Sequence, residues 1–184
     1  MTNSKKLCFA IAMGSLPIPV FAQHNSSPPM EDYEDVGQGA GMEWHYQIKD
    51  GVPNLEFGVK ETGHRLDRLW EFSCSKMEGE HGTISNTIFA KPPEIQPDDQ
   101  FGFSVRIDKG KSVGLVANRG PFQVQGYDTY FPQFEITDKH DLWDLLRHGK
   151  RAYINLNGNK FSIHLDGSAK AIGTFINSCR TKSN

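Results

Sequence analysis

The sequence predicts one mainly β domain, a single β-sandwich or open barrel of about ten short strands with two short helices. Three observations support this prediction. Apolar and polar residues alternate in short runs from residue 42 onward, which is the period of a half-buried strand. Turn-forming residues, mainly Gly, Pro, Asn and Asp, separate these runs. Helical spacing is found only over 138–148 and 168–180.

The strands are expected in the following order. Residues 42–48 and 55–59 flank Asp50-Gly51, which predicts a hairpin. A second hairpin is expected close to the C-terminus, because Asn157-Gly158 is a strong two-residue turn signal. Alternation predicts the remaining strands and the two arms of that hairpin over 69–77, 83–90, 101–107, 112–117, 122–127, 130–136, 151–156 and 160–165.

Two helices are expected to cover the sheet. In the first, over 138–148, Thr137 or Asp138 can cap the start and Gly149 can end the helix. In the second, Ser168 is a candidate N-cap. The apolar positions that fall on one face are Leu142, Leu145 and Leu146 in the first helix, and Ala171, Ile172, Phe175, Ile176 and Cys179 in the second.

Residues 1–22 are typical of an export signal. Lys5 and Lys6 precede an apolar run, and Val20-Phe21-Ala22 predicts cleavage after Ala22. The alternative is a membrane anchor, but the run is shorter than the ~20 apolar residues that span a bilayer, and two prolines interrupt it. We therefore expect a periplasmic or secreted protein without an integral membrane segment after signal removal.

Charge separates the exported chain into an acidic leader over 23–41 and a neutral body over 42–184. The leader is polar, contains four acidic residues and no Lys or Arg, and is expected to be disordered. The whole chain carries a formal charge of −2, so without the two signal lysines and the leader the body is formally neutral. A neutral body argues against binding to nucleic acid, which requires a concentrated positive surface.

The cysteines agree with export. Cys74 and Cys179 remain after signal removal, and an even number in an oxidising compartment predicts a disulfide between them. Two free thiols or an intermolecular bond are the alternatives. The bond would attach the terminal helix to the strand that contains Trp70, Phe72 and Cys74, and by the chain-entropy account it would contribute about 4–5 kcal/mol.

No pattern in the sequence predicts a metal site, a cofactor or a catalytic nucleophile. No two histidines have the spacing of a zinc site, and the glycines of 37–41 lack the spacing and the following helix of a phosphate loop. A general acid and base could still be assembled from separate strands. The protein is therefore expected not to be an enzyme, with an envelope hydrolase as the alternative.

Aromatic residues gather in one stretch rich in Gly and Pro. The candidate binding residues are Phe122, Tyr127, Tyr130 and Phe131. Such residues can form a partner surface when they are exposed. The alternative is that they fill the core of a small β domain.

Three features of the sequence resemble small secreted bacterial β-sandwich proteins of the invasion-associated locus B type. They are the strand Trp70-Glu71-Phe72-Ser73-Cys74, the turn Asp108-Lys109-Gly110 and the closing helix from Gly167 to Cys179. The resemblance covers about residues 66–180. It implies a non-enzymatic role in the periplasm or at the cell surface and transfers no functional residue.

These observations favour an exported binding or protein-interaction module, in an inhibitor-like, immunity-like or invasion-associated form. The expected partner is another envelope or secreted protein. A structural envelope protein is a further alternative.

Overall fold

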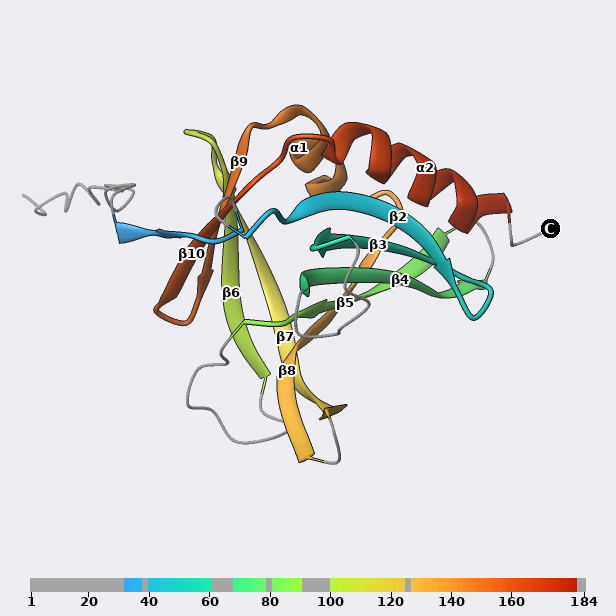
Figure 1. Cartoon of the computed structure of the whole chain (residues 1–184), viewed down its shortest axis with the longest axis horizontal. Coiled ribbons are helices and arrows are strands. Elements are labelled where there is room, and N and C mark those ends of the chain that lie inside the picture. The colour runs from blue at the N-terminus through green and yellow to red at the C-terminus, as the bar shows by residue number, and fades with distance from the viewer. Residues whose placement is uncertain are drawn as a thin grey trace, which may run out of the picture.

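The computed structural model describes residues 32–37, 40–60, 68–78, 81–90, 100–124 and 127–181. These residues form ten strands and two helices (Figure 1). In chain order they are β1 Glu34–Asp35, β2 Glu43–Lys49, β3 Val52–Gly58, β4 Arg68–Glu78, β5 His81–Ile88, β6 Gln100–Ile107, β7 Ser112–Val124, β8 Tyr127–Thr137, α1 Leu142–His148, β9 Arg151–Leu156, β10 Asn159–His164 and α2 Ser168–Thr181.

All ten strands belong to one sheet, in the order β1-β10-β9-β6-β7-β8-β5-β4-β3-β2. The sheet curls into a half-barrel, and both helices lie over the end formed by β2, β3 and β4 (Figure 1). The prediction of a mainly β fold with two helices is confirmed, in its open-barrel form. Both predicted hairpin turns are present, with left-handed backbone at Asp50-Gly51 and Asn157-Gly158.

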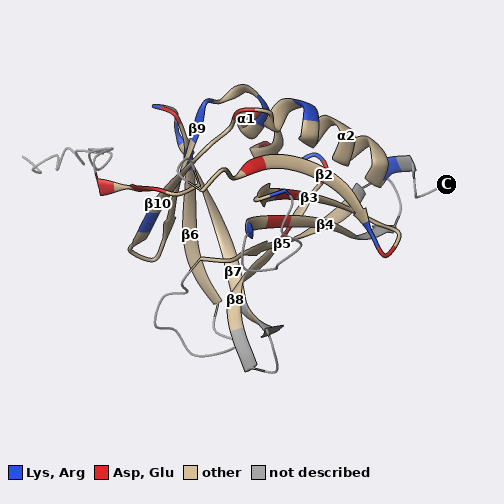
Figure 2. Cartoon of the chain, in the orientation of Figure 1, with Lys and Arg blue, Asp and Glu red and all other residues tan. Residues whose placement is uncertain are grey.

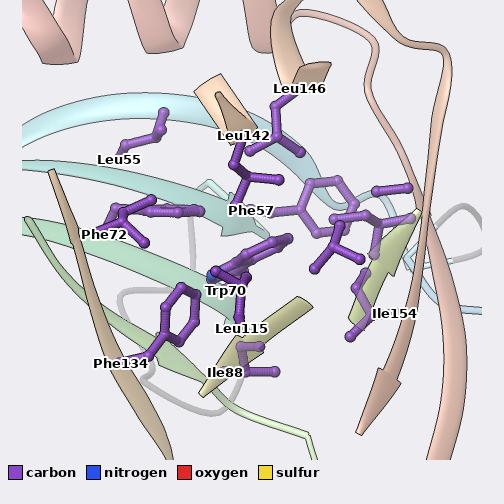
Figure 3. Close-up of a cluster of buried hydrophobic side chains, with 14 of the residues drawn as sticks. Leu55, Phe57, Trp70, Phe72, Ile88, Leu115, Phe134, Leu142, Leu146 and Ile154 are labelled. Carbon is purple, nitrogen blue, oxygen red and sulfur yellow. The ribbon is translucent and has the colours of Figure 1, made fainter. Parts of the chain in front are cut away.

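The core lies on the concave face, where every second residue of a strand points inward. Phe57 on β3 pairs with Trp70 on β4, which in turn pairs with Ile88 on β5. All three are at most 1% exposed. Leu142 and Leu146 from α1 close this cluster from above (Figure 3). The convex face, called the outer face below, carries the alternate residues.

The terminal helix is held to the sheet by its apolar face and by the predicted disulfide. Ile172, Phe175 and Cys179 are fully buried. Cys179 is bonded to Cys74 on β4, with 5.9 Å between the two Cα atoms. The predicted pairing of the cysteines is therefore confirmed.

The start of α1 differs from the prediction. The helix begins at Leu142, and the imidazole Nδ1 of His140 accepts the backbone N–H of that residue at 3.1 Å. Asp138 does not cap the helix, because its carboxylate accepts a 2.8 Å hydrogen bond from Arg180 near the end of α2. The predicted cap Ser168 likewise donates its hydroxyl to the Leu146 carbonyl at 2.7 Å. Both side chains thus connect the two helices.

The sequence predicts two separate strands over 112–117 and 122–127. This prediction is wrong, because β7 runs without interruption from 112 to 124. Gly120 and Pro121 suggested a break, yet they pair with Phe131 and Tyr130 on β8. The described part of β6 pairs with β7 only as far as Asn118. Beyond that point β7 has a described neighbour on one side only, and a proline without an N–H is tolerated at such an edge.

The disordered leader expected over 23–41 is wrong for one segment. The β1 strand pairs in parallel with β10, and Val36 packs against the core. This segment is ordered because β9 and β10 supply partners for its side chains, which composition alone does not reveal. The expected signal peptide over 1–22 and leader residues 23–31 and 38–39 lie outside the described residues.

Candidate functional site

The structure does not bring the predicted aromatic residues together into one described surface. Phe131 is buried at 9% exposure, and its ring contacts the Phe89 ring at 5.2 Å between centroids. Tyr130, next to it, is half-buried. The side chains of Phe122 and Tyr127 lie outside the described residues. A binding role for this stretch therefore stays a prediction.

A cluster of charged side chains lies on the outer face of β2, β3 and β4. His45, Glu56 and Glu71 are register partners across these strands. The Glu56 carboxylate is 3.2 Å from His45 Nε2 and 3.0 Å from Arg68 Nη1, and it also accepts a hydrogen bond from Lys49. Arg68 and Lys49 both contact Glu71 as well. The cluster is therefore a closed network of opposite charges.

The network controls the ionisation of Glu56. Burial alone raises the pKa of this carboxyl group. Hydrogen bonds from His45 and Lys49, with the charges of Arg68 and Lys49, outweigh burial and lower the pKa from 4.5 to about 2. Glu56 is thus ionised at neutral pH and is unsuited to donate a proton as a general acid.

A cleft of about 340 Å³ separates α1 from α2, with Trp143, Ile172 and Ile176 among its walls. Asp138 and Arg180 line the cleft, but their side chains form an ion pair with each other. Among the described residues, no three His, Cys, Asp or Glu side chains are grouped so that they could hold a metal ion.

A shallow concavity of the described surface lies over β6, β7 and β9. It measures about 520 Å³ and is called the outer groove. Its described lining comprises Gly102, Phe103, Ser104, Gly114, Leu115, Val116, Asn155, Asn157 and Gly158. Most of these residues are glycine or carry a hydroxyl or amide group. The groove thus combines hydrogen-bonding groups with apolar surface, and its chemistry suits hydrogen bonding more than proton transfer.

Strand register explains the shape of the outer groove. Ser104 pairs with Gly114 on one side and with Asn155 on the other, while Gly102 pairs with Val116. A Cβ atom added at either glycine would meet no atom within 4 Å, so the floor is open to solvent. Val116 is 62% exposed beside this floor. The groove thus offers amide and hydroxyl groups around a small apolar contact.

Two residues beyond Ser104 on the same face of β6, Arg106 pairs with Tyr153 on β9. The Arg106 side chain is buried at 6% exposure, and its guanidinium carbon is 5.2 Å from the Tyr153 ring centroid and 5.7 Å from that of Tyr33. The two rings meet edge to face. Arg106 Nε and Nη2 are buried and have no hydrogen-bond partner among the described residues.

Sequence reasoning missed both the outer groove and Arg106. The outward positions Gly102, Ser104 and Arg106 alternate visibly with buried phenylalanines in the sequence. Their neighbours Gly114 and Asn155 could not be assigned to them, because that requires the order and register of β6, β7 and β9. Nor does the sequence reveal that Tyr33, 73 residues before Arg106, lies against it.

Comparison with known proteins gives a weak structural resemblance. The crystal structure of invasion associated protein B from Bartonella henselae matches this chain with a TM-score of 0.42 and 14% identity. The match covers 74% of this chain and 92% of that chain. No protein-family model and no curated protein matches the sequence. Within the described residues, no helix has the length and apolar character needed to cross a membrane.

Proposed function

We propose that the protein is exported and acts as a non-enzymatic binding module that recognises another envelope or secreted protein through the outer groove. The observation that carries the proposal is the open floor at Gly102 and Gly114, where no side chain occupies the outer face. An extended polypeptide segment fits such a floor, because its amides can bond to Ser104 and Asn155 while a side chain packs on Val116.

Export is the second part of the proposal. The disulfide between Cys74 and Cys179 supports it, because such bonds persist in oxidising compartments. The basic and apolar start of the sequence supports it independently. Expression of the full chain in a Gram-negative bacterium followed by N-terminal sequencing tests it. A periplasmic or secreted product that begins at Gln23 is expected, whereas a cytoplasmic product that retains residues 1–22 contradicts export.

A pull-down tests the groove. The mature oxidised protein is the bait for envelope and secreted fractions, with mass spectrometry as the readout. Gly114→Tyr fills the floor, and no neighbouring atom lies within 4 Å of the new Cβ, so the fold is expected to be retained. Lys170→Tyr adds the same ring to an exposed position on α2 and is the matched control.

One stoichiometric protein that is lost with Gly114→Tyr and kept with Lys170→Tyr is the expected result. A partner that both variants retain would exclude the outer groove as the contact surface. An empty pull-down with the unaltered protein would contradict the binding module itself.

A further inference from the structure

We propose that β1 occupies a docking site for an extended acidic strand of a partner protein, which replaces β1 on β10 and places a carboxylate on Arg106. This site is the β10 edge of the sheet with the outer face beside it, and it is distinct from the outer groove. The proposal goes beyond the function proposed above and can fail without affecting it.

The first argument is the charge of the surface under β1. Asp35 of the β1 segment forms a 2.8 Å ion pair with Arg151 on β9, and Asp32 lies 3.5 Å from Lys160 on β10. Acidic β1 and basic β10 are neighbours in Figure 2. When β1 leaves, Arg151 and Lys160 lose these acidic neighbours, and Arg106 loses the Tyr33 ring that covers it. The uncovered face then attracts an acidic segment.

The second argument is the unpaired edge of Arg106. Its Nε and Nη2 point in the same direction and form the fork that binds the two oxygens of a carboxylate side by side. These are the two atoms that have no partner among the described residues. Tyr33 and Tyr153 cover the guanidinium by ring contacts, which do not satisfy its N–H groups. A buried donor without an acceptor favours any ligand that supplies one.

The position of Tyr33 defines the chemistry of that ligand. A glutamate side chain reaches about as far from the backbone as the centre of a tyrosine ring. A strand that pairs with β10 as β1 does, with glutamate where Tyr33 lies, therefore brings its carboxylate close to the Arg106 guanidinium. Acidic residues at the places of Asp32 and Asp35 retain the pairs with Lys160 and Arg151.

The present occupant has a short strand and solvent-exposed ion pairs. The β1 strand has two residues, and the backbone N–H of Val36 donates to the Ser162 carbonyl at 2.9 Å. Asp35 and Asp32 are 40% and 52% exposed in their ion pairs, where solvent screens the attraction. Because a second copy would supply the same tyrosine and leave the fork unpaired, a partner with a better-matched strand is the favoured occupant.

Fluorescence anisotropy with two labelled peptides tests the proposal. One has the chain's own sequence over residues 30–37, and the other carries Tyr33→Glu. Both are titrated into the full mature oxidised protein, in its unaltered form and in a form loosened by Tyr33→Ala with Asp35→Asn. The loosened form is examined further with Arg106→Lys, which keeps the charge but lacks the fork, and with Lys111→Gln, an exposed control in the β6–β7 turn.

The glutamate peptide is expected to bind the loosened protein about tenfold more tightly than the native peptide. This preference should vanish with Arg106→Lys and persist with Lys111→Gln. The unaltered protein should bind both peptides more weakly, because its own β1 competes at high effective concentration.

Equal affinity for the two peptides, or a preference that survives Arg106→Lys, would overturn the carboxylate site. Absence of binding to the loosened protein would overturn the docking site, as would assembly of that protein into strand-exchanged dimers in place of peptide binding. If Arg106→Lys fails to fold, the Nε–H resonance of unaltered Arg106 decides. A shift of this resonance with the glutamate peptide and not with the native peptide supports carboxylate binding by the Arg106 fork. An unchanged resonance overturns it.

Discussion

The indole N–H of Trp44 on β2 donates a 3.0 Å hydrogen bond to the backbone carbonyl of His164 at the end of β10. In the sheet order β2 is the last strand, and β10 is the second strand from the other end. The His164 imidazole makes a second contact in the opposite direction. Its Nε2 is 2.9 Å from the Met42 carbonyl, and its ring lies against Phe57 on β3. The curled sheet is therefore closed at this point by side chains, where strand pairing does not close it.

Replacement of the indole tests this closure. Trp44→Phe keeps an aromatic ring in the core but removes the donor, so we expect a loss of about 1–2 kcal/mol in the free energy of unfolding, measured with urea. Trp44→Ala also leaves a cavity and should cost about 3–5 kcal/mol. A Trp44→Phe variant as stable as the unaltered protein would show that the hydrogen bond contributes nothing.

The sequence contains local signals that predicted much of the fold. Asp50-Gly51 and Asn157-Gly158 each set the register of a hairpin within a few residues, and Cys179 falls on the apolar face of its helix. Contacts such as that between Trp44 and His164, which are 120 residues apart, depend on how the whole sheet curls. No local pattern encodes them.

Loss of the disulfide should destabilise the protein mainly in its oxidised form. Cys74→Ala opens a ring with a sequence separation of 105 residues, for which the chain-entropy account gives about 4–5 kcal/mol. Thermal unfolding with and without reductant measures the effect. Under reductant the variant and the unaltered protein should unfold at similar temperatures. Equal losses in both conditions would mean that packing at residue 74, and not the bond, is responsible.

The Glu56 network should make stability depend on pH in acid. Because the pKa of Glu56 is lowered from 4.5 to about 2 on folding, its contribution is complete above pH 4.5 and is lost as pH falls towards 2. Glu56→Gln should therefore cost about 3 kcal/mol at neutral pH, and the difference should shrink between pH 4.5 and 2.

Urea unfolding over this pH range measures the Glu56 effect. Glu43→Gln, which removes an exposed carboxylate on β2, is the control and should change little. A deficit in Glu56→Gln that stays constant from pH 7 to pH 2 would contradict the lowered pKa.

The candidate site was less predictable than the fold for a chemical reason. Catalytic and metal sites use residue types that are conspicuous in a sequence, whereas the outer groove is built from Gly102, Gly114, Ser104 and asparagines. Such residues occur on any outer strand face. Only the register between β6, β7 and β9 shows that they share one concavity.

Two truncations of the leader should differ in their effect on stability. Removal of residues 23–31 is expected to leave the melting temperature of the mature protein unchanged. Removal of 23–37 also deletes β1 and the pairs of Asp35 and Asp32, and should cost about 2 kcal/mol. Hydrogen exchange at the Ser162 and Lys160 amides gives a local readout. Identical melting of the two truncated proteins would restore the prediction that the whole leader is disordered.

Phe131 and Tyr130 distinguish core packing from binding in the aromatic stretch. Phe131 is buried against Phe89, so Phe131→Ala should cost about 3 kcal/mol in the free energy of unfolding. Tyr130 is half-buried, and Tyr130→Ala should retain the fold while it weakens capture of the partner in the pull-down, if the stretch contributes a second contact. Unfolding of Tyr130→Ala would instead assign the tyrosine to the core. Full capture by a folded Tyr130→Ala protein would leave the outer groove as the contact surface.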